Sequence, residues 1–285
     1  MREFAKKSYD KIDLKFQDYS LAIGERTYVM GILNATPDSF SDGGRFNEVE
    51  AGVRHARQMV EEGADIIDVG GESTRPGAAE VTLDDELKRV VPLIQAIRAN
   101  VNVPISIDTY KAKVAEAALN AGANIVNDVW GLQREPEIAK VAAKAGAPVI
   151  AMHNQKGHEY DEDIIASMIK FFKKSIQIAL DAGVPKEHII LDPGIGFGKT
   201  PAQNVIVMGR LHELHVLGYP VLLGTSRKSM IGKILDLPSD ERVEGTVATN
   251  VLGVLAGMEI IRVHDVKENL RAVKVADAIV RGWNG

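Results

Sequence analysis

Short apolar runs alternate with longer amphipathic segments along most of the chain. Eight runs of about the length of a strand occur at 28–33, 64–70, 103–108, 123–128, 147–153, 188–192, 219–224 and 259–265. Between several of them, apolar residues recur at i, i+3, i+4 and i+7, which predicts amphipathic helices over 47–63, 84–100, 111–122 and 135–146. The alternation predicts a repeated β/α unit.

The junctions between these segments favour parallel strands that helices cover on both faces. A glycine stands just before the next strand in 61–70, 120–129 and 144–152, where it suits a left-handed helix C-cap. The strand cores IIDV, IVND and VLLG lack the strict polar alternation of a half-exposed strand. Eight such units without a linker rich in Pro, Ser or Gly predict a single α/β domain.

The predicted architecture is one (β/α)₈ TIM barrel over 28–285, with residues 1–27 as an N-terminal extension that covers the barrel bottom. The 285 residues of the chain suit this fold, which typically needs roughly 250. A doubly wound open sheet is the alternative.

Composition narrows the classes of function. The chain has 34 Lys and Arg against 39 Asp and Glu, a net charge of −5, and no cysteine. The absence of cysteine excludes disulfides, thiolate nucleophiles, zinc–thiolate sites and iron–sulfur clusters. The acidic balance argues against nucleic-acid binding, and the lack of a signal peptide or of about 18 consecutive apolar residues predicts a cytoplasmic protein without a membrane partner.

Polar residues stand at all eight predicted strand ends, where such a barrel carries its active site. A single Asp or Asn there can be explained by helix capping or by a turn, but a complete ring predicts a ligand pocket. The ring comprises Asn34, Asp68, 72–75, Asp108, Asn127, Asp128, 152–154, Asp192, 226–229, Arg262 and His264.

The residue types in the ring indicate a flat heterocycle. Asp108, Asn127 and Asp192 offer acceptors and an amide donor to ring N–H and amino groups, and Lys228 donates to a ring carbonyl or nitrogen. These pairings suit the 2-amino-4-oxo edge of a pterin or the edge of a guanine.

An anion site is predicted beside it. Asn34, Arg262 and His264 lie at the first and last strands, which become neighbours when a barrel closes, and a guanidinium with an imidazole can hold phosphate or diphosphate. The loop at 226–228 is a second candidate, because phosphate sites in these barrels often use the loops after strands seven and eight.

Other motifs are weak. The loops 35–44 and 71–80 have the composition of mobile lids or of ordinary surface loops, and GIGFGKT lacks the spacer of a P-loop. His153 and His158 lack metal-ligand spacing, which favours a solvated loop over a zinc site at 153–163.

Seven motifs together resemble the dihydropteroate synthase family. They are GILNATPDSFSDGG at 31–44, DVGGESTRPG at 68–77, SIDTYK at 106–111, NDVWG at 127–131, LDPGIGFGKT at 191–200, GTSRKS at 224–229 and RVHDV at 262–266. The resemblance covers nearly the whole barrel, and the departures at Ala35 and Gly198 remove no polar group.

The resemblance implies a transferase of folate biosynthesis, a sulfonamide target that acts as a homodimer with Mg²⁺ on small-molecule substrates. It joins p-aminobenzoate to the methylene carbon of 6-hydroxymethyl-7,8-dihydropterin diphosphate and releases diphosphate and 7,8-dihydropteroate. By the same resemblance, the residues that bind the pterin are Asp108, Asn127, Met152, Asp192, Phe197, Gly224 and Lys228, and the catalytic ones among them are Asp108, Asn127, Asp192 and Lys228. Those for diphosphate are Asn34, Thr74, Arg262, Val263 and His264, with Asn34 also on Mg²⁺, and those for p-aminobenzoate are Phe40, Arg75, Pro76 and Ser229.

The residues also suggest a mechanism. The chain has no Cys and no evident Ser–His–Asp set, so the nucleophile can be the arylamine itself. We expect a dissociative, SN1-like substitution in which Asp108 and Asp192 stabilise a pterin methylene cation. A pterin-binding methyltransferase and a non-catalytic pterin-binding barrel are the alternatives, and diphosphate release that depends on p-aminobenzoate would exclude both.

Overall fold

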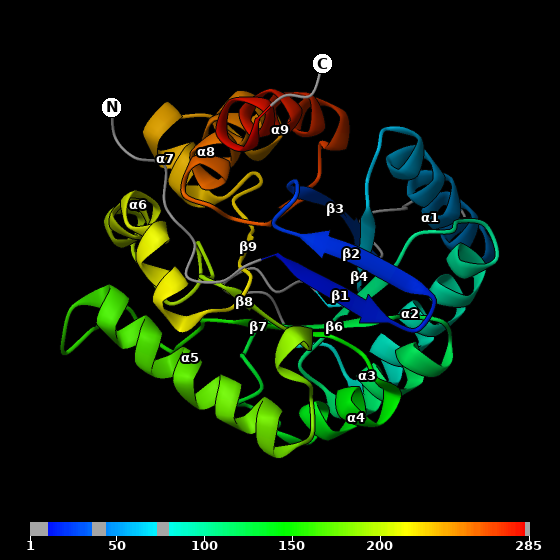
Figure 1. The fold of residues 1–285 in the computed structure, drawn as a ribbon. Helices are drawn as coiled ribbons and strands as arrows, with labels where there is room; N and C mark the ends of the chain where they lie inside the picture. The colour runs from blue at the N-terminus through cyan, green and yellow to red at the C-terminus, as the bar shows by residue number, and fades with distance from the viewer. Residues whose placement is uncertain (1–10, 36–43, 73–79, 283–285) are drawn as a thin grey trace.

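The computed structural model describes residues 11–35, 44–72 and 80–282, in which eight parallel strands form a barrel (Figure 1). The strands are β3 (Tyr28–Asn34), β4 (Ile66–Gly70), β5 (Ile105–Asp108), β6 (Ile125–Asp128), β7 (Val149–Met152), β8 (Ile189–Asp192), β9 (Leu222–Leu223) and β10 (Ile260–Val263). Each coincides with one of the eight apolar runs, with β3 extending one residue beyond its run to Asn34, so the strand prediction is confirmed.

The sheet closes into a ring. The strands follow the order β8-β7-β6-β5-β4-β3-β10-β9, and a bridge between Leu191 and Val221 joins the two ends. The Leu191 N–H donates to the carbonyl oxygen of Pro220 at 2.9 Å in the same place. The TIM-barrel prediction is therefore confirmed over the open doubly wound sheet.

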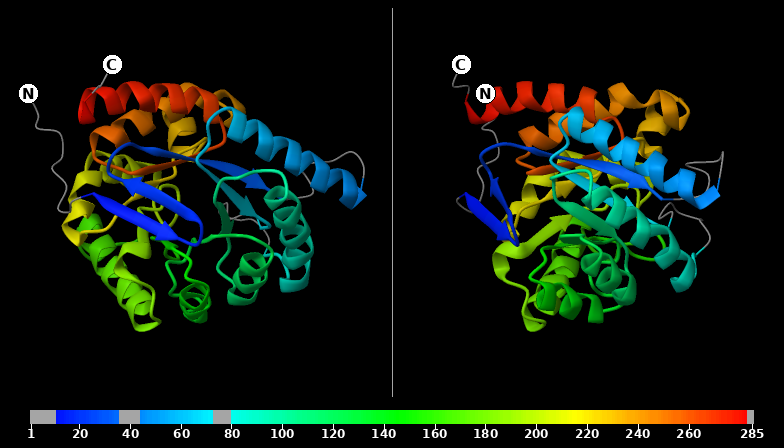
Figure 2. Two further views of the ribbon diagram at one scale, coloured as in Figure 1. Left: turned by 45° about the vertical axis from the view of Figure 1, so that its right-hand side comes forward. Right: turned by 90° about the vertical axis from the view of Figure 1, so that its right-hand side faces the viewer.

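Helices surround the barrel and connect its strands (Figures 1 and 2). They are α1 (Gly44–Glu61), α2 (Leu83–Arg98), α3 (Ala112–Asn120), α4 (Glu137–Ala145), α5 (Ile164–Asp181), α6 (Pro201–Gly209), α7 (Ser229–Leu235), α8 (Val243–Leu255) and α9 (Val266–Arg281), with short 3₁₀ turns at Lys186–His188, Leu211–Leu217 and Ser239–Glu241. The four helices predicted from periodicity correspond to α1 to α4. Gly146 ends α4 with φ 62°, the left-handed C-cap that the sequence predicts.

The strands send successive side chains alternately outward and inward, which divides the apolar core into two parts. Outward residues such as Val126 and Val149 pack with helix residues such as Phe172 in the larger cluster. Inward residues such as Ile125 and Ile150 form a separate cluster inside the barrel.

An antiparallel hairpin of β1 (Ile12–Phe16) and β2 (Tyr19–Ile23) covers one end of the barrel (Figure 2). Its buried side chains Leu14, Phe16, Leu21 and Ile23 join the inward cluster, so they fill the barrel floor. Because the floor is occupied by the chain's own side chains, a ligand has access only from the opposite end.

Among the residues that the structure describes, no helix is both long and apolar enough to cross a membrane.

Candidate active site

The candidate site follows from the two-residue repeat of inward-facing side chains along each strand. In a strand, residues two apart face the same side, so each inward apolar residue of the floor is followed two residues later by another inward residue. On β4 this step leads from Ile66 to Asp68, and on β6 from Ile125 to Asn127. The same step leads from Ile150 to Met152, Ile190 to Asp192, Leu222 to Gly224 and Ile260 to Arg262. The apolar floor thus passes directly into a polar layer.

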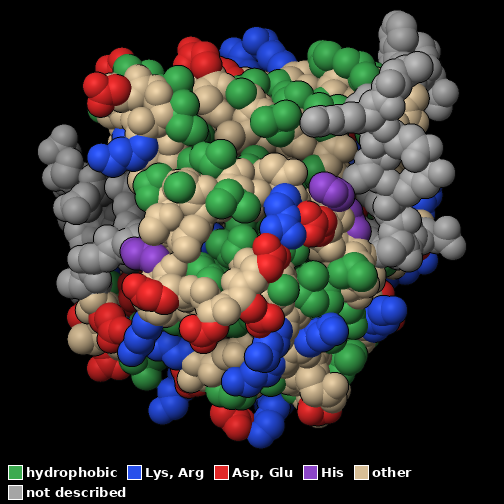
Figure 3. Space-filling view, turned by 90° about the vertical axis from the view of Figure 1, so that its left-hand side faces the viewer, with side chains coloured by type: hydrophobic (Ala, Val, Ile, Leu, Met, Phe, Trp, Pro, Cys, Tyr) green, Lys and Arg blue, Asp and Glu red, His purple; other side chains and the backbone are tan. Residues whose placement is uncertain are grey.

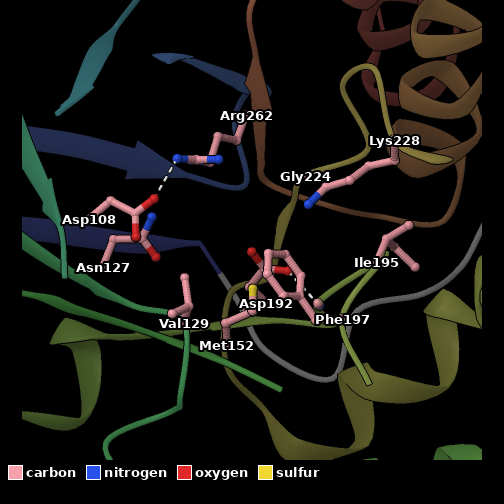
Figure 4. A pocket seen from close by; sticks show the side chains of 11 residues that line it. Asp108, Asn127, Val129, Met152, Asp192, Ile195, Phe197, Gly224, Lys228 and Arg262 are labelled. Carbon is pink, nitrogen blue, oxygen red and sulfur yellow. Dashed lines mark hydrogen bonds and ion pairs between the residues drawn. The ribbon is translucent and has the colours of Figure 1, made fainter. Parts of the chain in front are cut away.

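A pocket opens above this floor at the carboxyl ends of the strands (Figure 4). The empty space between its lining atoms, open solvent at the mouth included, is about 320 Å³. Its lining residues are Asp108, Asn127, Val129, Met152, Asp192, Gly194, Ile195, Phe197, Gly224, Lys228 and Arg262. All seven residues predicted to bind the pterin line this one pocket. The loops and strands that supply them lie far apart in the sequence.

Arg262 bridges the carboxylates of Asp68 and Asp108 at one wall of the pocket, and Figure 4 shows its contact with Asp108. Its Nε lies 2.6 Å from Asp68 Oδ2, and its Nη2 lies 2.8 Å from Asp108 Oδ2. The Asn127 amide also donates to Asp68 Oδ2, at 3.2 Å. Arg262 is therefore held against the predicted pterin site, although the sequence assigned it to the diphosphate alone.

Burial sets the charge state of the pocket acids. It raises the pKa of Asp108 to about 7, against the lowering effect of Arg262. It likewise raises the pKa of Asp192 to about 6, although the Gly194 N–H donates to that carboxylate at 2.7 Å. For Arg262, burial lowers the pKa, but Asp68 and Asp108 outweigh it and raise the pKa, so the guanidinium stays charged.

The opposite wall comes from the loop between β8 and α6. Gly194 has φ 63°, and a Cβ there would lie 2.0 Å from the carbonyl oxygen of His153, so only glycine allows this close approach. The loop places the Phe197 ring in the pocket, and Lys228 Nζ lies 4.0 Å from the ring centroid. An aromatic face and an ammonium group therefore meet at the pocket edge.

The residues predicted for diphosphate lie at the ends of β3 and β10, as the closed ring requires. Asn34 is the last residue of β3, and the strands on either side of β3 are β4 and β10. His264 follows β10, and its Nδ1 lies 2.9 Å from Ser226 Oγ. The side chain of Val263 is buried in the outer apolar cluster, so only its backbone can face a ligand.

The p-aminobenzoate prediction lies mostly beyond the described residues. Phe40, Arg75 and Pro76 fall outside them, and so does Thr74 of the diphosphate set. Ser229 is exposed at the first position of α7, next to Lys228. The lid prediction for 35–44 and 71–80 concerns largely these same segments.

Sequence reasoning missed several residues of the site. Asp68 belongs to the polar ring, but the sequence analysis gave it no ligand. Because Ile66 faces the barrel interior, Asp68, two residues later on the same strand, could have been expected to face the site. Val129 and Ile195 line the pocket from residues just beyond β6 and β8, where no polar type marks them. Asp128, in contrast, points outward and accepts backbone N–H bonds from residues 130 and 132, at 2.8 and 2.7 Å.

The expectation of a solvated loop over 153–163 holds for His158, which is exposed, but it is wrong for His153. Its ring is 2% exposed and packs edge-on against Phe171 with centroids 4.8 Å apart. Burial, followed by the charge of Lys199, lowers its pKa to about 2, which keeps the ring neutral. Within 11–35, 44–72 and 80–282, no three His, Cys, Asp or Glu side chains are grouped to hold a metal.

Comparison with known proteins decides the family. The model of the pterin binding enzyme family matches residues 30–264. A dihydropteroate synthase of Clostridium beijerinckii is 56% identical over 269 residues, which cover 94% of this chain and all of that protein. The chain belongs to the dihydropteroate synthase family.

Solved structures of dihydropteroate synthases share the fold. The Clostridium difficile enzyme, crystallised in the presence of pteroic acid, has 57% sequence identity and a TM-score of 0.90 and covers 92% of this chain and 99% of its own. The Xanthomonas albilineans dihydropteroate synthase with 4-aminobenzoic acid has 41% identity and a TM-score of 0.90 and covers 95% and 98%. The family resemblance drawn from the seven motifs is confirmed.

Proposed function

We propose that this chain joins p-aminobenzoate to 6-hydroxymethyl-7,8-dihydropterin diphosphate and forms 7,8-dihydropteroate and diphosphate. The observation that carries the proposal is the convergence of all seven predicted pterin residues on one pocket. The relatives named above are dihydropteroate synthases that cover nearly the whole chain, one of them crystallised with pteroic acid and one with 4-aminobenzoic acid.

The pocket suits a pterin in shape and in polarity. Met152 and Phe197 supply apolar surface for the flat ring, and Asp108, Asn127 and Asp192 surround it with acceptors and one amide donor. These groups are nearly fully buried, so the ring N–H and amino groups of a pterin would satisfy acceptors that water cannot easily reach.

The reaction is a substitution at the pterin methylene carbon. The bond from that carbon to the diphosphate oxygen breaks, and its electron pair leaves with the diphosphate. The amine nitrogen of p-aminobenzoate then forms a bond to the carbon and loses a proton. In the dissociative order that we propose, the carboxylates of Asp108 and Asp192 face the cationic intermediate in a site of low dielectric, where their attraction is strong.

The diphosphate fits the mouth of the barrel beside β3 and β10. There, His264 and the Nη1 atom of Arg262, which is not used by Asp68 or Asp108, can donate to phosphate oxygens. Lys228 lies on the neighbouring loop and adds positive charge near the pocket edge.

Mg²⁺ is part of this proposal, and the residues present fit it. The amide of Asn34 at the end of β3 offers one oxygen, and Mg²⁺ commonly takes few protein ligands together with water and substrate phosphates. When bound, Mg²⁺ would neutralise charge on the leaving diphosphate. Loss of diphosphate binding on chelation, restored by added Mg²⁺, is the expected result.

We also propose a homodimer in the cytoplasm. Large apolar side chains are exposed on α6, α7 and α8, namely Val205 (48%), Ile206 (48%), Ile234 (65%), Leu235 (44%) and Leu252 (54%). Figure 3 views this side and shows hydrophobic side chains in its upper and central part, interspersed with some charged ones, and a denser band of charged side chains below. Light scattering on the purified protein and cell fractionation test the two statements.

Diphosphate release that depends on p-aminobenzoate tests the activity. The purified protein with the pterin diphosphate and Mg²⁺ should release diphosphate only when the arylamine is added, with dihydropteroate formed in equal amount. Pterin binding without turnover would instead favour a non-catalytic pterin-binding barrel. Methyl transfer from a methylated pterin to a corrinoid would favour the methyltransferase alternative.

A further inference from the structure

Lys199 is a buried lysine that the proposed reaction does not use. It follows the loop between β8 and α6, immediately before the N-cap residue Thr200, and it is 4% exposed. A buried ammonium group is costly unless its hydrogen bonds are satisfied, so its surroundings indicate what it holds.

The surroundings offer one acceptor for each N–H of the ammonium group. Lys199 Nζ lies 2.9 Å from His153 Nδ1 and 3.1 Å from the carbonyl oxygens of both Gly194 and Phe197. Burial keeps the imidazole neutral, and an ammonium group has only donors, so the contact assigns the acceptor role to Nδ1 and the ring proton to Nε2. A charged lysine has three donors, so these acceptors satisfy all of them.

The two carbonyls belong to the loop that forms one wall of the pocket. Gly194, Ile195 and Phe197 all line the pocket, and Lys199 ties the beginning and the end of this stretch to each other. The far side of the loop is fastened as well, because the Tyr160 hydroxyl donates to the Gly198 carbonyl at 2.9 Å.

We propose that Lys199 is a positioning residue for the pterin, whose ammonium group holds the 193–198 loop in the shape that presents Phe197 and Asp192 to the pterin ring. The inference rests on the proposed function, because it concerns the same pocket. Lys199 does not line the pocket itself and acts through the loop.

The charge of Lys199 is part of its effect. The titratable groups around it are His153, which it contacts, and Asp192 and Lys228, whose charges act on it. Burial lowers the pKa of Lys199 to about 7, with Asp192 opposing that shift and Lys228 adding to it. A neutral amine has only two donors, so one loop carbonyl or the imidazole loses its bond when the pH rises through about 7.

Lys199→Met tests the proposal, because methionine keeps much of the stem and removes the donors. Binding of 6-hydroxymethylpterin, measured by calorimetry at pH 6, should weaken by about tenfold, the scale of a lost charge-assisted bond. KM for the pterin diphosphate should rise by a similar factor, while KM for p-aminobenzoate stays within about twofold. Lys186→Met is the matched control: it changes an exposed lysine on the Lys186–His188 turn and should leave pterin binding unchanged.

The pH dependence separates positioning by charge from simple packing. The ratio of wild-type to Lys199→Met affinity should fall towards one between pH 6 and pH 9, because the wild type loses its own ammonium charge over that range. The ratio cancels the titration of the pterin itself. The charge of Lys199 also lowers the pKa of Asp192, and this effect of the ammonium group is contained in the ratio. A ratio that stays constant with pH, or equal affinities at pH 6, would overturn the proposal.

A Lys199 variant that does not fold, or a wild type that binds no pterin, would each leave a decisive measurement. If Lys199→Met does not fold, Tyr160→Phe removes only the hydroxyl bond to the same loop, and unchanged pterin affinity in that variant would overturn the role of the loop restraint. If the wild type binds no pterin, the proposed function fails rather than the assignment of Lys199. Wild-type pterin binding that the Lys199 variant retains in full would refute the assignment alone.

Discussion

Replacing Asp108 by asparagine removes one negative charge from the pocket and changes the size of the side chain very little. Asp68, Asp108 and Arg262 form a connected group with a net charge of −1 when both acids are ionised. The substitution makes that group neutral. A unit charge about 4 Å from a cation contributes roughly 4 kcal/mol at an effective dielectric constant of about 20. Arg262 offsets part of this attraction, and the asparagine dipole keeps another part.

About 2.7 kcal/mol of lost transition-state stabilisation corresponds to about 10²-fold in rate, so we expect kcat of Asp108→Asn to fall by at least that factor. The assay is diphosphate release at saturating substrates, with single-turnover measurements to isolate the chemical step. Asp68→Asn is the matched control, because it changes the charge of the same group by the same amount from a residue that does not line the pocket. We expect a smaller loss there. A kcat of Asp108→Asn within about threefold of the wild type would refute electrostatic stabilisation by this carboxylate.

Three other predictions concern described contacts, and a fourth concerns the proposed arylamine site. The kcat/KM for the pterin substrate should fall as the pH drops through about 7 and then about 6, because Asp108 and Asp192 have raised pKa values there and lose their charge on protonation; a flat acid limb would contradict this. Lys111→Met should lower the free energy of unfolding in urea by about 3–5 kcal/mol, since it leaves Glu86, 1% exposed, without its cation, whereas a loss below about 1 kcal/mol would show that the pair is dispensable. Phe16→Ala should cost about 3–5 kcal/mol by the same measurement, and a neutral result would mean that the hairpin does not stabilise the barrel floor. A sulfonamide should compete with p-aminobenzoate and not with the pterin substrate, and competition with the pterin would place the arylamine site wrongly.

The strands and the first four helices could be predicted because their signals are local. An apolar run, a 3.6-residue period and a glycine such as Gly146 each depend on a few neighbouring residues. The hairpin at the barrel floor was not predicted, although β1 alternates apolar and polar residues, because this short pattern stands in a charged segment outside the repeated β/α units. The packing of Phe16 inside the barrel depends on residues more than a hundred positions away.

The pterin residues could be predicted because strand ends in a closed barrel converge on one place whatever their separation in sequence. The contacts among the side chains that surround the pocket could not be predicted in this way. His153 and Lys199 lie 46 positions apart, and their contact depends on the tight approach of the loop at Gly194 to the end of β7. A histidine next to polar neighbours therefore suggested solvent, whereas the fold buries it among aromatic rings.

Arg262 shows how the fold can give one side chain two tasks that the sequence separates. The residue type indicated an anion, and the inward step from Ile260 places the guanidinium beside the pterin wall as well. Its Nε and Nη2 hold Asp68 and Asp108, which fixes the plane of the guanidinium, and its Nη1 donates to neither acid. A guanidinium oriented in this way spans the proposed boundary between the pterin and its leaving group. The positive charge that would attract diphosphate is thus the same charge that opposes the rise in the pKa of Asp108, so loss of Arg262 should impair both diphosphate binding and the stabilisation of the cation.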